Sequence, residues 1–313
     1  MNQINRATGL LVLEVVNSNP NGDPDRESDP RQRANGQGEI SPVSFKRKLR
    51  DLVEAKDQPV FQSLKARLQL EDGCYEILEH RGRVREDIVN EMNDGEGGDF
   101  MKSTFVKKYW DARVFGNTFL EKKKQEDNDA EQKKAAKGKK GDEKNEQEKK
   151  RLGTIKTGVV QFGMGLSVSP IDVVRHTNTN KAGVEEGKDR GMAPMAYRVV
   201  THAVYCMPFF FNPTYAPKSG CTQKDLDLLK ALIPYAYDHT RSAIRPDVRI
   251  RHAWFVEHKD ALGTCPDYKI FNALIPKAKV EMPTCWEDYT GTEPDSLPPE
   301  LTEKGLVLVD LAN

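Results

Sequence analysis

A nearly continuous apolar run lies close to the start of the chain. Residues 8–16 (TGLLVLEVV) are apolar or β-branched with little interruption, and they lead directly into the polar turn residues NSNPNGDPD. An apolar run that ends at turn residues is typical of a buried strand that feeds a loop. We therefore predict a central strand here and a loop after it.

The pattern becomes helical beyond this loop. Ser41 is a residue type that favours the N-cap position, and Pro42 suits the first helical position. The apolar residues that follow recur at helical spacing; they are Phe45, Leu49, Leu52 and Val53. This spacing predicts a helix with one apolar face.

The rest of the chain predicts further strands and a second helix. Residues 157–177 and 195–211 are rich in β-branched residues and predict two strands, and residues 251–256 predict a last one. Thr222 and Asp225 make a capping-box-like start for a helix. The apolar face of that helix consists of Leu226, Leu229, Leu232 and Ile233, and Pro234 strains or ends it.

The predicted order of elements is strand, helix, strands, helix, strand. It matches a ferredoxin-like or RRM-like β-α-β-β-α-β plan, which is an α+β fold. Residues 1–313 are expected to form one such domain with long insertions, and residues 283–313 a peripheral, Pro-rich tail. Residues 107–119 (KKYWDARVFGNTF) fit a short helix or a strand equally well.

Composition adds little about partners, because the 48 Lys and Arg residues balance the 48 Asp and Glu residues. The segment 121–151 mixes both charges and lacks large apolar residues, so we expect a solvated, disordered insertion. The five cysteines form no C-x-x-C pair and are expected to be reduced thiols. The N-terminal apolar stretch is too short for a membrane span and has no cleavage signal, so a cytoplasmic location is predicted.

The loop after the first strand carries three asparagines, Asn17, Asn19 and Asn21, together with Asp23 and Asp25. Such side chains can hold an RNA backbone. They are equally typical of a rigid turn in which Asn and Asp bond to local backbone, and this alternative stays open. A metal site is less favoured, because a hard cation needs several converging oxygens and only the two aspartates are close in sequence.

The first predicted helix is strongly basic. Its run FKRKLR places four cations in five positions, at Lys46, Arg47, Lys48 and Arg50. These cations would meet several phosphates, although a solvated helix face explains the same composition. The helix follows the Asn-rich loop directly, so the two together predict one basic groove.

Two other segments are candidates for nucleic-acid contact. In residues 157–169, Gln161 and Phe162 lie among glycines, where a backbone can approach a ligand and Phe162 can stack; a bulge or close strand packing is the favoured alternative. The polar excursion at 175–198 is long enough to be functional or disordered. Its candidate contacts are Lys188, Arg190, Tyr197 and Arg198, with Met192 or Met195 as a wedge between bases or, alternatively, as core filler.

Motifs of catalysis are missing from the sequence. The six histidines show no H-x-x-x-H or H-E-x-x-H spacing, and no P-loop or G-x-S-x-G sequence occurs. We therefore expect no catalytic residues, no metal and no cofactor.

Four stretches, taken in order, resemble the Cascade backbone subunits of the RAMP superfamily, closest to the type I-C and type I-B branch of CRISPR systems. They are LVLEVVNSNPNGDPD (11–25), FKRKLR (45–50), DARVFG (111–116) and TGVVQFGMGLS (157–167), and AYRVVTHAVY (196–205) adds a fifth. The resemblance implies an RRM-like palm with hand-like insertions. It also implies that 175–195 is a thumb-like hairpin and that the protein is not an enzyme.

The partners that the resemblance implies are guide RNA, further copies of the chain packed head to tail, other Cascade subunits, and target DNA recognised through the guide. Base pairing would then read the target, while the protein holds backbone and shape.

Two other hypotheses remain. Backbone relatives in type III complexes cleave RNA through an Asp in the loop after the first strand, and Asp23 is the matching residue for a metal-dependent ribonuclease. The third hypothesis is a scaffold whose basic helix binds an acidic protein.

Overall fold

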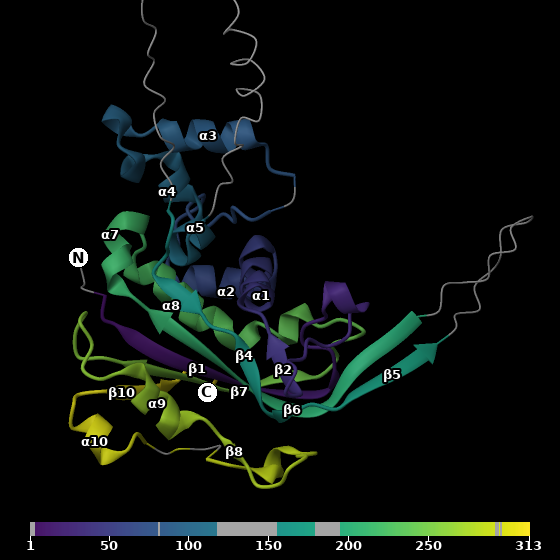
Figure 1. Cartoon of the computed structure of the whole chain (residues 1–313). Coiled ribbons are helices and arrows are strands. Elements are labelled where there is room, and N and C mark those ends of the chain that lie inside the picture. Colours follow the sequence, from purple (N-terminus) through teal and green to yellow (C-terminus); the bar gives the residue numbers. More distant parts are fainter. Residues whose placement is uncertain (1–3, 81, 118–154, 179–194, 292–293, 295) are drawn as a thin grey trace, which may run out of the picture.

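The computed structural model describes residues 4–80, 82–117, 155–178, 195–291, 294 and 296–313 (Figure 1). The predicted charged insertion at 121–151 lies outside the described residues. So does most of the predicted thumb-like segment at 175–195, with its candidates Lys188, Arg190 and Met192; Met195 is placed only as the first residue of a strand.

The described part of the chain is built on one eight-stranded sheet with the order β10-β7-β1-β6-β4-β2, to which β3 and β5 add by pairing with β6. All of these pairings are antiparallel. The strands are β1 (Ala7–Ser18), β2 (Gln37–Ile40), β3 (Val160–Phe162), β4 (Gly165–Pro170), β5 (Val173–Asn178), β6 (Met195–Phe211), β7 (Val248–Glu257) and β10 (Val307–Asp310). A separate pair joins β8 (Lys277–Ala278) to β9 (Tyr289–Thr290).

Helices connect and cover the strands, which confirms the predicted α+β class. They are α1 (Pro42–Glu54), α2 (Pro59–Leu68), α3 (Arg85–Asn93), α4 (Thr104–Lys108), α5 (Trp110–Phe115), α7 (Ala216–Ser219), α8 (Gln223–Leu232), α9 (Asp267–Leu274) and α10 (Pro299–Thr302). Short 3-10 turns lie between them: η1 (Pro24–Arg26), η2 (Glu96–Gly98), η3 (Phe100–Lys102), η4 (Pro213–Tyr215), η5 (Ile233–Tyr235), η6 (Asp238–Thr240) and η7 (Trp286–Asp288). The ferredoxin-like or RRM-like assignment stays a prediction.

The first strand is central, as predicted. Strand β1 lies between β6 and β7, with Leu13 opposite Tyr205 on one side and Ile250 on the other. Its side chains alternate between two separate apolar clusters, one holding Leu11 and the other Leu10. Because both faces of β1 are covered, the run has no polar alternation.

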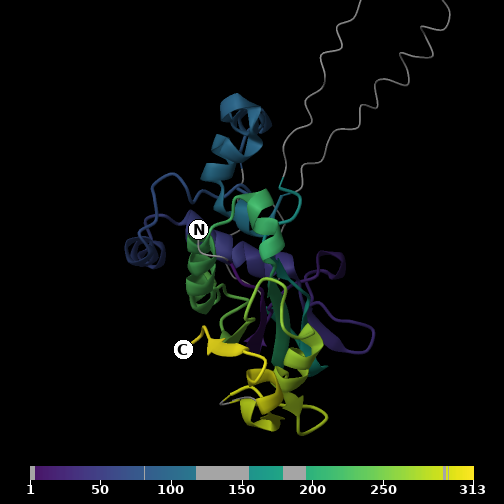
Figure 2. The same ribbon diagram turned by 90° about the vertical axis from the view of Figure 1, so that its left-hand side faces the viewer.

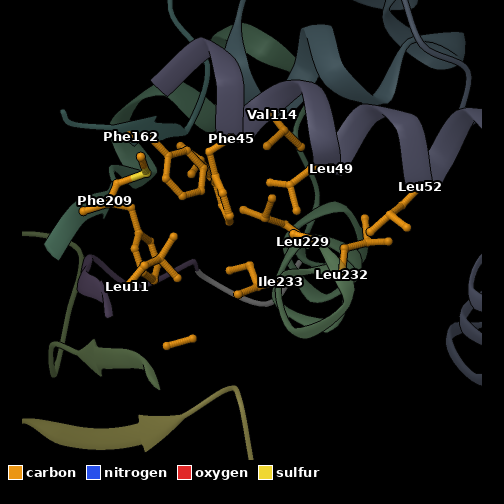
Figure 3. Close-up of a cluster of buried hydrophobic side chains, with 14 of the residues drawn as sticks. Leu11, Phe45, Leu49, Leu52, Val114, Phe162, Phe209, Leu229, Leu232 and Ile233 are labelled. Carbon is orange, nitrogen blue, oxygen red and sulfur yellow. The ribbon is translucent and has the colours of Figure 1, made fainter. Parts of the chain in front are cut away.

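The main core lies between the sheet and the helices α1 and α8, where Phe45, Leu49 and Leu229 meet Phe162 and Phe209 (Figure 3). Both predicted helix starts are confirmed. Ser41 Oγ accepts the N–H of Ser44 at 3.2 Å, and Thr222 forms a reciprocal capping box with Asp225. The sequence left residues 107–119 open; within the described part of this stretch, Lys107 and Lys108 end α4 and Trp110–Phe115 forms α5.

The other face of the sheet is covered by the C-terminal segment. Figures 1 and 2 place α9 and α10 on the opposite side of the sheet from α1. Leu297, Leu301 and Leu306 are buried there, and β10 pairs with β7 along the edge of the sheet. The tail at 283–313 is therefore more than peripheral, because its spaced leucines supply part of a second core.

The segment 157–177 forms three strands instead of the single predicted one, and all three pair with β6. The first break lies at Gly163, whose N–H donates to the Pro208 carbonyl at 2.7 Å. A Cβ on Gly163 would lie 2.8 Å from Pro208 Cγ, so the close approach needs glycine. Beyond β4, strands β5 and β6 continue as a two-stranded arm that projects past the helices (Figure 1).

Candidate nucleic-acid interface

The Asn-rich loop after β1 is held by its own side chains. Asn19 is 2% exposed; its Nδ2 donates to the Ser28 carbonyl at 2.8 Å and its backbone N–H to the Ile244 carbonyl at 2.8 Å. Its Oδ1 is buried and has no hydrogen-bond partner among the described residues. Asn17 is exposed, with a left-handed φ of 42° that asparagine tolerates.

The same loop is fixed to the start of α1. Asn21 Oδ1 accepts the backbone N–H of Ser41 at 2.7 Å. Asp23 caps η1 by accepting the N–H of Asp25 at 3.2 Å, and Arg31 lies 3.9 Å from the Asp23 carboxylate. Loop and helix are therefore adjacent, and the aspartate side chain bonds locally as the rigid-turn interpretation expects.

The four cations of α1 do not form one basic face. Successive helical residues point about 100° apart, so a run of cations spreads around the helix. Arg47 is paired with Asp51 at 2.6 Å and Glu54 at 2.5 Å on the helix itself. Lys46 points towards α5, where its Nζ lies 5.1 Å from the centre of the Phe115 ring. Burial and the nearby Arg50 lower the pKa of Lys46.

Arg50 is part of the structural core. It is 3% exposed and pairs with the Asp111 carboxylate at 2.9 Å, which also accepts the N–H of Leu78 at 2.7 Å. Arg113 forms a second buried pair with Asp225 at 2.7 Å. The DARVFG stretch therefore ties α5 to α1 and α8, and this ion-pair role was missed by sequence reasoning.

Lys48 differs from its three neighbours. It is 5% exposed, its Nζ donates to Thr240 Oγ1 at 3.1 Å and lies 4.9 Å from the centre of the Tyr237 ring, and within the described residues it forms no ion pair. Burial, followed by the nearby Arg245 guanidinium, lowers the pKa of Lys48 to about 8, and the Asp51 carboxylate opposes this shift only in part.

Arg245 stands beside Lys48 and was missed by sequence reasoning. It is half-buried in the loop before β7, and its Nε donates to the Asn19 carbonyl at 3.0 Å. We call Asn19, Lys48, Thr240 and Arg245 the basic corner. Two cations lie together there without a carboxylate pairing with either in the described structure, which is the environment that an anion would stabilise.

A second group of cations lies where the arm leaves the sheet. Arg198 on β6 pairs with the carboxylates of Glu27 and, at 3.3 Å, of Asp29. Arg175 on β5 pairs with Asp29 at 2.5 Å, and this hydrogen bond is the main cause of the lowered pKa of Asp29. With Arg26 these residues line a cleft of about 390 Å³, and we call them the arginine cluster. Asn19, through its bond to Ser28, connects this cluster with the basic corner.

The remaining candidates are not brought to these two sites. Tyr197 lies on β6 next to Arg198, opposite His176 of β5. Gln161 pairs with Phe210 at the other end of β6, about 40 Å from Arg198 at roughly 3.3 Å per residue. Phe162 is 7% exposed and packs in the core, 5.2 Å from Phe45 between ring centres, so its ring has no free face for a base.

The described residues contain no group of three or more His, Cys, Asp or Glu side chains placed to hold a metal ion. All five cysteines are free thiols. In the described ranges no helix has both the length and the apolar content needed to cross a bilayer.

Comparison with known proteins gives a family. The model of the family described as CRISPR-associated protein Cas7 matches residues 5–292. No curated protein matches the chain. Two solved structures are similar at 12% identity: a "CRISPR RNA-guided surveillance complex, pre-nicking" (82% of this chain and 79% of that chain, TM-score 0.39) and a "CRISPR RNA-guided surveillance complex" (82% and 70%, TM-score 0.41).

Proposed function

The chain belongs to the Cas7 family of CRISPR-associated proteins, and we propose that it is a non-catalytic backbone subunit that binds guide RNA in a Cascade surveillance complex. The observation that supports an RNA-binding site is the basic corner, where Lys48 and Arg245 lie together without an ion pair in the described part of the chain.

Burial of an unpaired lysine is unfavourable, because the ammonium leaves water without a compensating charge. A phosphate seated against Lys48 and Arg245 supplies that charge. The neighbouring groups suit an RNA backbone as well: Thr240 is a hydroxyl partner, Asn17 lies near the end of β1, and Asn21 lies on the loop that follows it. Contacts of this kind position a strand without reading its sequence.

Membership of the family also supports a proposal for the larger assembly. Copies of the chain pack head to tail on one guide RNA, a heterologous contact that continues as an open helix when the rotation does not close. The palm has an RRM-like plan and the subunit belongs to a type I-C or I-B system, whereas the thumb-like role predicted for 175–195 falls largely outside the described residues. Target DNA is recognised through base pairs with the guide, and other Cascade subunits cap the filament.

A pair of variants tests the RNA site. The double change Lys48→Met and Arg245→Gln removes both cations of the basic corner, whereas Lys218→Met removes one exposed cation from α7. We expect the double variant to bind single-stranded guide RNA about tenfold or more weakly, and its slope of log affinity against log salt to become less steep by about 1.4. The Lys218 variant should keep both values.

Full affinity and an unchanged salt slope in the double variant would show that this corner does not contact RNA. RNA of discrete length that co-purifies with wild-type protein in large particles supports the filament. A wild-type protein that stays a clean monomer and ignores added guide RNA contradicts the proposed function as a whole.

A further inference from the structure

The arginine cluster differs from the basic corner, because two of its arginines, Arg175 and Arg198, are already paired with carboxylates. Arg198 uses its atoms in two different ways. Its Nη1 donates to the backbone carbonyls of Glu27 at 2.5 Å and Arg26 at 3.3 Å, whereas Nη2 pairs with the Glu27 carboxylate and Nε with Asp29. The first pair of bonds holds the loop backbone, and the other two involve carboxylates.

The two carboxylates are not equivalent. The Asp29 side chain is 18% exposed and is shared by Arg175 and Arg198. The Glu27 side chain is 82% exposed, and among the described residues Arg198 is the one cation with which it forms an ion pair. An ion pair with one partner fully in water is worth little, so Glu27 can leave Arg198 without disturbing the loop.

A phosphate and a carboxylate compete for the same guanidinium donors, since both accept two parallel N–H bonds. Arg26, Arg175 and Arg198 line one open cleft with Glu27 and Asp29, on the same loop that Asn19 connects to the basic corner. The position of the Glu27 carboxylate is therefore where a backbone phosphate would bind next to Arg198.

From these contacts we infer that the arginine cluster is a second phosphate site for RNA, and that Glu27 occupies it as a phosphate mimic until RNA displaces it. This inference rests on the proposed RNA-binding function and adds a regulatory element to it. The carboxylate lowers the affinity for short or weakly held strands, because each binding event must first break the Glu27–Arg198 pair. Guide RNA that is also anchored at the basic corner overcomes this competition.

The test compares Glu27→Gln with Asp25→Asn. Asp25 is exposed on the same loop, so its change removes the same charge two residues away without touching Arg198. We expect Glu27→Gln to bind single-stranded RNA about two- to fivefold more tightly than Asp25→Asn, the range that an exposed ion pair allows. In an Arg198→Gln background the gain should vanish, because the freed donor is gone.

Inorganic pyrophosphate, titrated by calorimetry, separates this inference from the proposed function. Tighter pyrophosphate binding to Glu27→Gln than to Asp25→Asn, lost again with Arg198→Gln, supports the phosphate site even if wild-type protein ignores guide RNA. Equal affinities of the two loop variants for both RNA and pyrophosphate would overturn it. A gain that persists in the Arg198→Gln background would overturn it as well, because the effect would then be one of net charge.

Discussion

Replacing Lys48 by methionine should make the protein more stable and its RNA binding weaker. The pKa of Lys48 falls from 10.5 to about 8 because the side chain is buried and Arg245 is close. At about 1.36 kcal/mol per unit, keeping the ammonium charged at pH 7 costs the folded state about 3 kcal/mol. Methionine fills a similar volume without the charge, and loses one hydrogen bond to Thr240, worth about 1 kcal/mol. A net gain of about 2 kcal/mol is expected.

The pH dependence of the wild-type unfolding free energy reports the same cost of the charged Lys48 without any substitution. A lysine with a depressed folded-state pKa destabilises the fold while it is charged, so the stability of the wild type rises as the pH passes from about 8 towards 10.5. About 2 kcal/mol of the penalty is relieved between pH 7 and pH 9.5. Buried tyrosines and thiols also respond to pH, but they are common to both proteins and cancel in the difference.

Guanidinium unfolding of both proteins at pH 7, 8.5 and 9.5 measures the effect. The stability advantage of Lys48→Met should be largest at pH 7 and should shrink steadily with pH. A difference in unfolding free energy between the two proteins that stays constant from pH 7 to pH 9.5 would refute the reasoning. A variant that is less stable than wild type at pH 7 would refute it as well. Either result would mean that a charge partner already compensates Lys48.

Three further results are expected. Guide-RNA affinity should fall about tenfold between pH 7 and pH 9, because a bound phosphate requires the proton on Lys48; fluorescence anisotropy checks this, and a flat profile would contradict it. Arg113→Leu should lower the unfolding free energy by about 3–5 kcal/mol, since Asp225 is left buried without its partner; an effect below about 1 kcal/mol in urea unfolding would show that the pair is dispensable. Gly9→Ala should destabilise by about 1–3 kcal/mol, because the added Cβ would lie 2.0 Å from Phe209 Cζ; an unchanged thermal midpoint would disprove that clash.

Local patterns were enough to predict the main elements. The strand at β1, the N-cap at Ser41 and the capping box at Thr222 each depend on a few neighbouring residues, and the structure confirms all three. The α+β class follows from their order. The three-strand division of 157–177 was missed, because it depends on where Pro208 of β6 meets Gly163.

The candidate site was harder to predict, because its geometry comes from contacts distant in sequence. Lys48 meets Thr240 across 192 residues, and Arg198 meets Glu27 across 171. A run of basic residues cannot indicate which cations will be neutralised by such partners. The sequence therefore singled out Lys48 together with its basic neighbours, but gave it the same role as Arg50, which lies in a buried ion pair.

Strand β6 runs for 17 residues from the tip of the described arm to the interior of the sheet. Because β3, β4 and β5 all pair with this one strand, the arm is a continuation of the sheet, and β6 runs unbroken from one to the other. Its direction is then set by the twist of the whole sheet. A core substitution that changes this twist would be amplified along the strand, so the stiffness of the sheet determines how accurately the arm is directed.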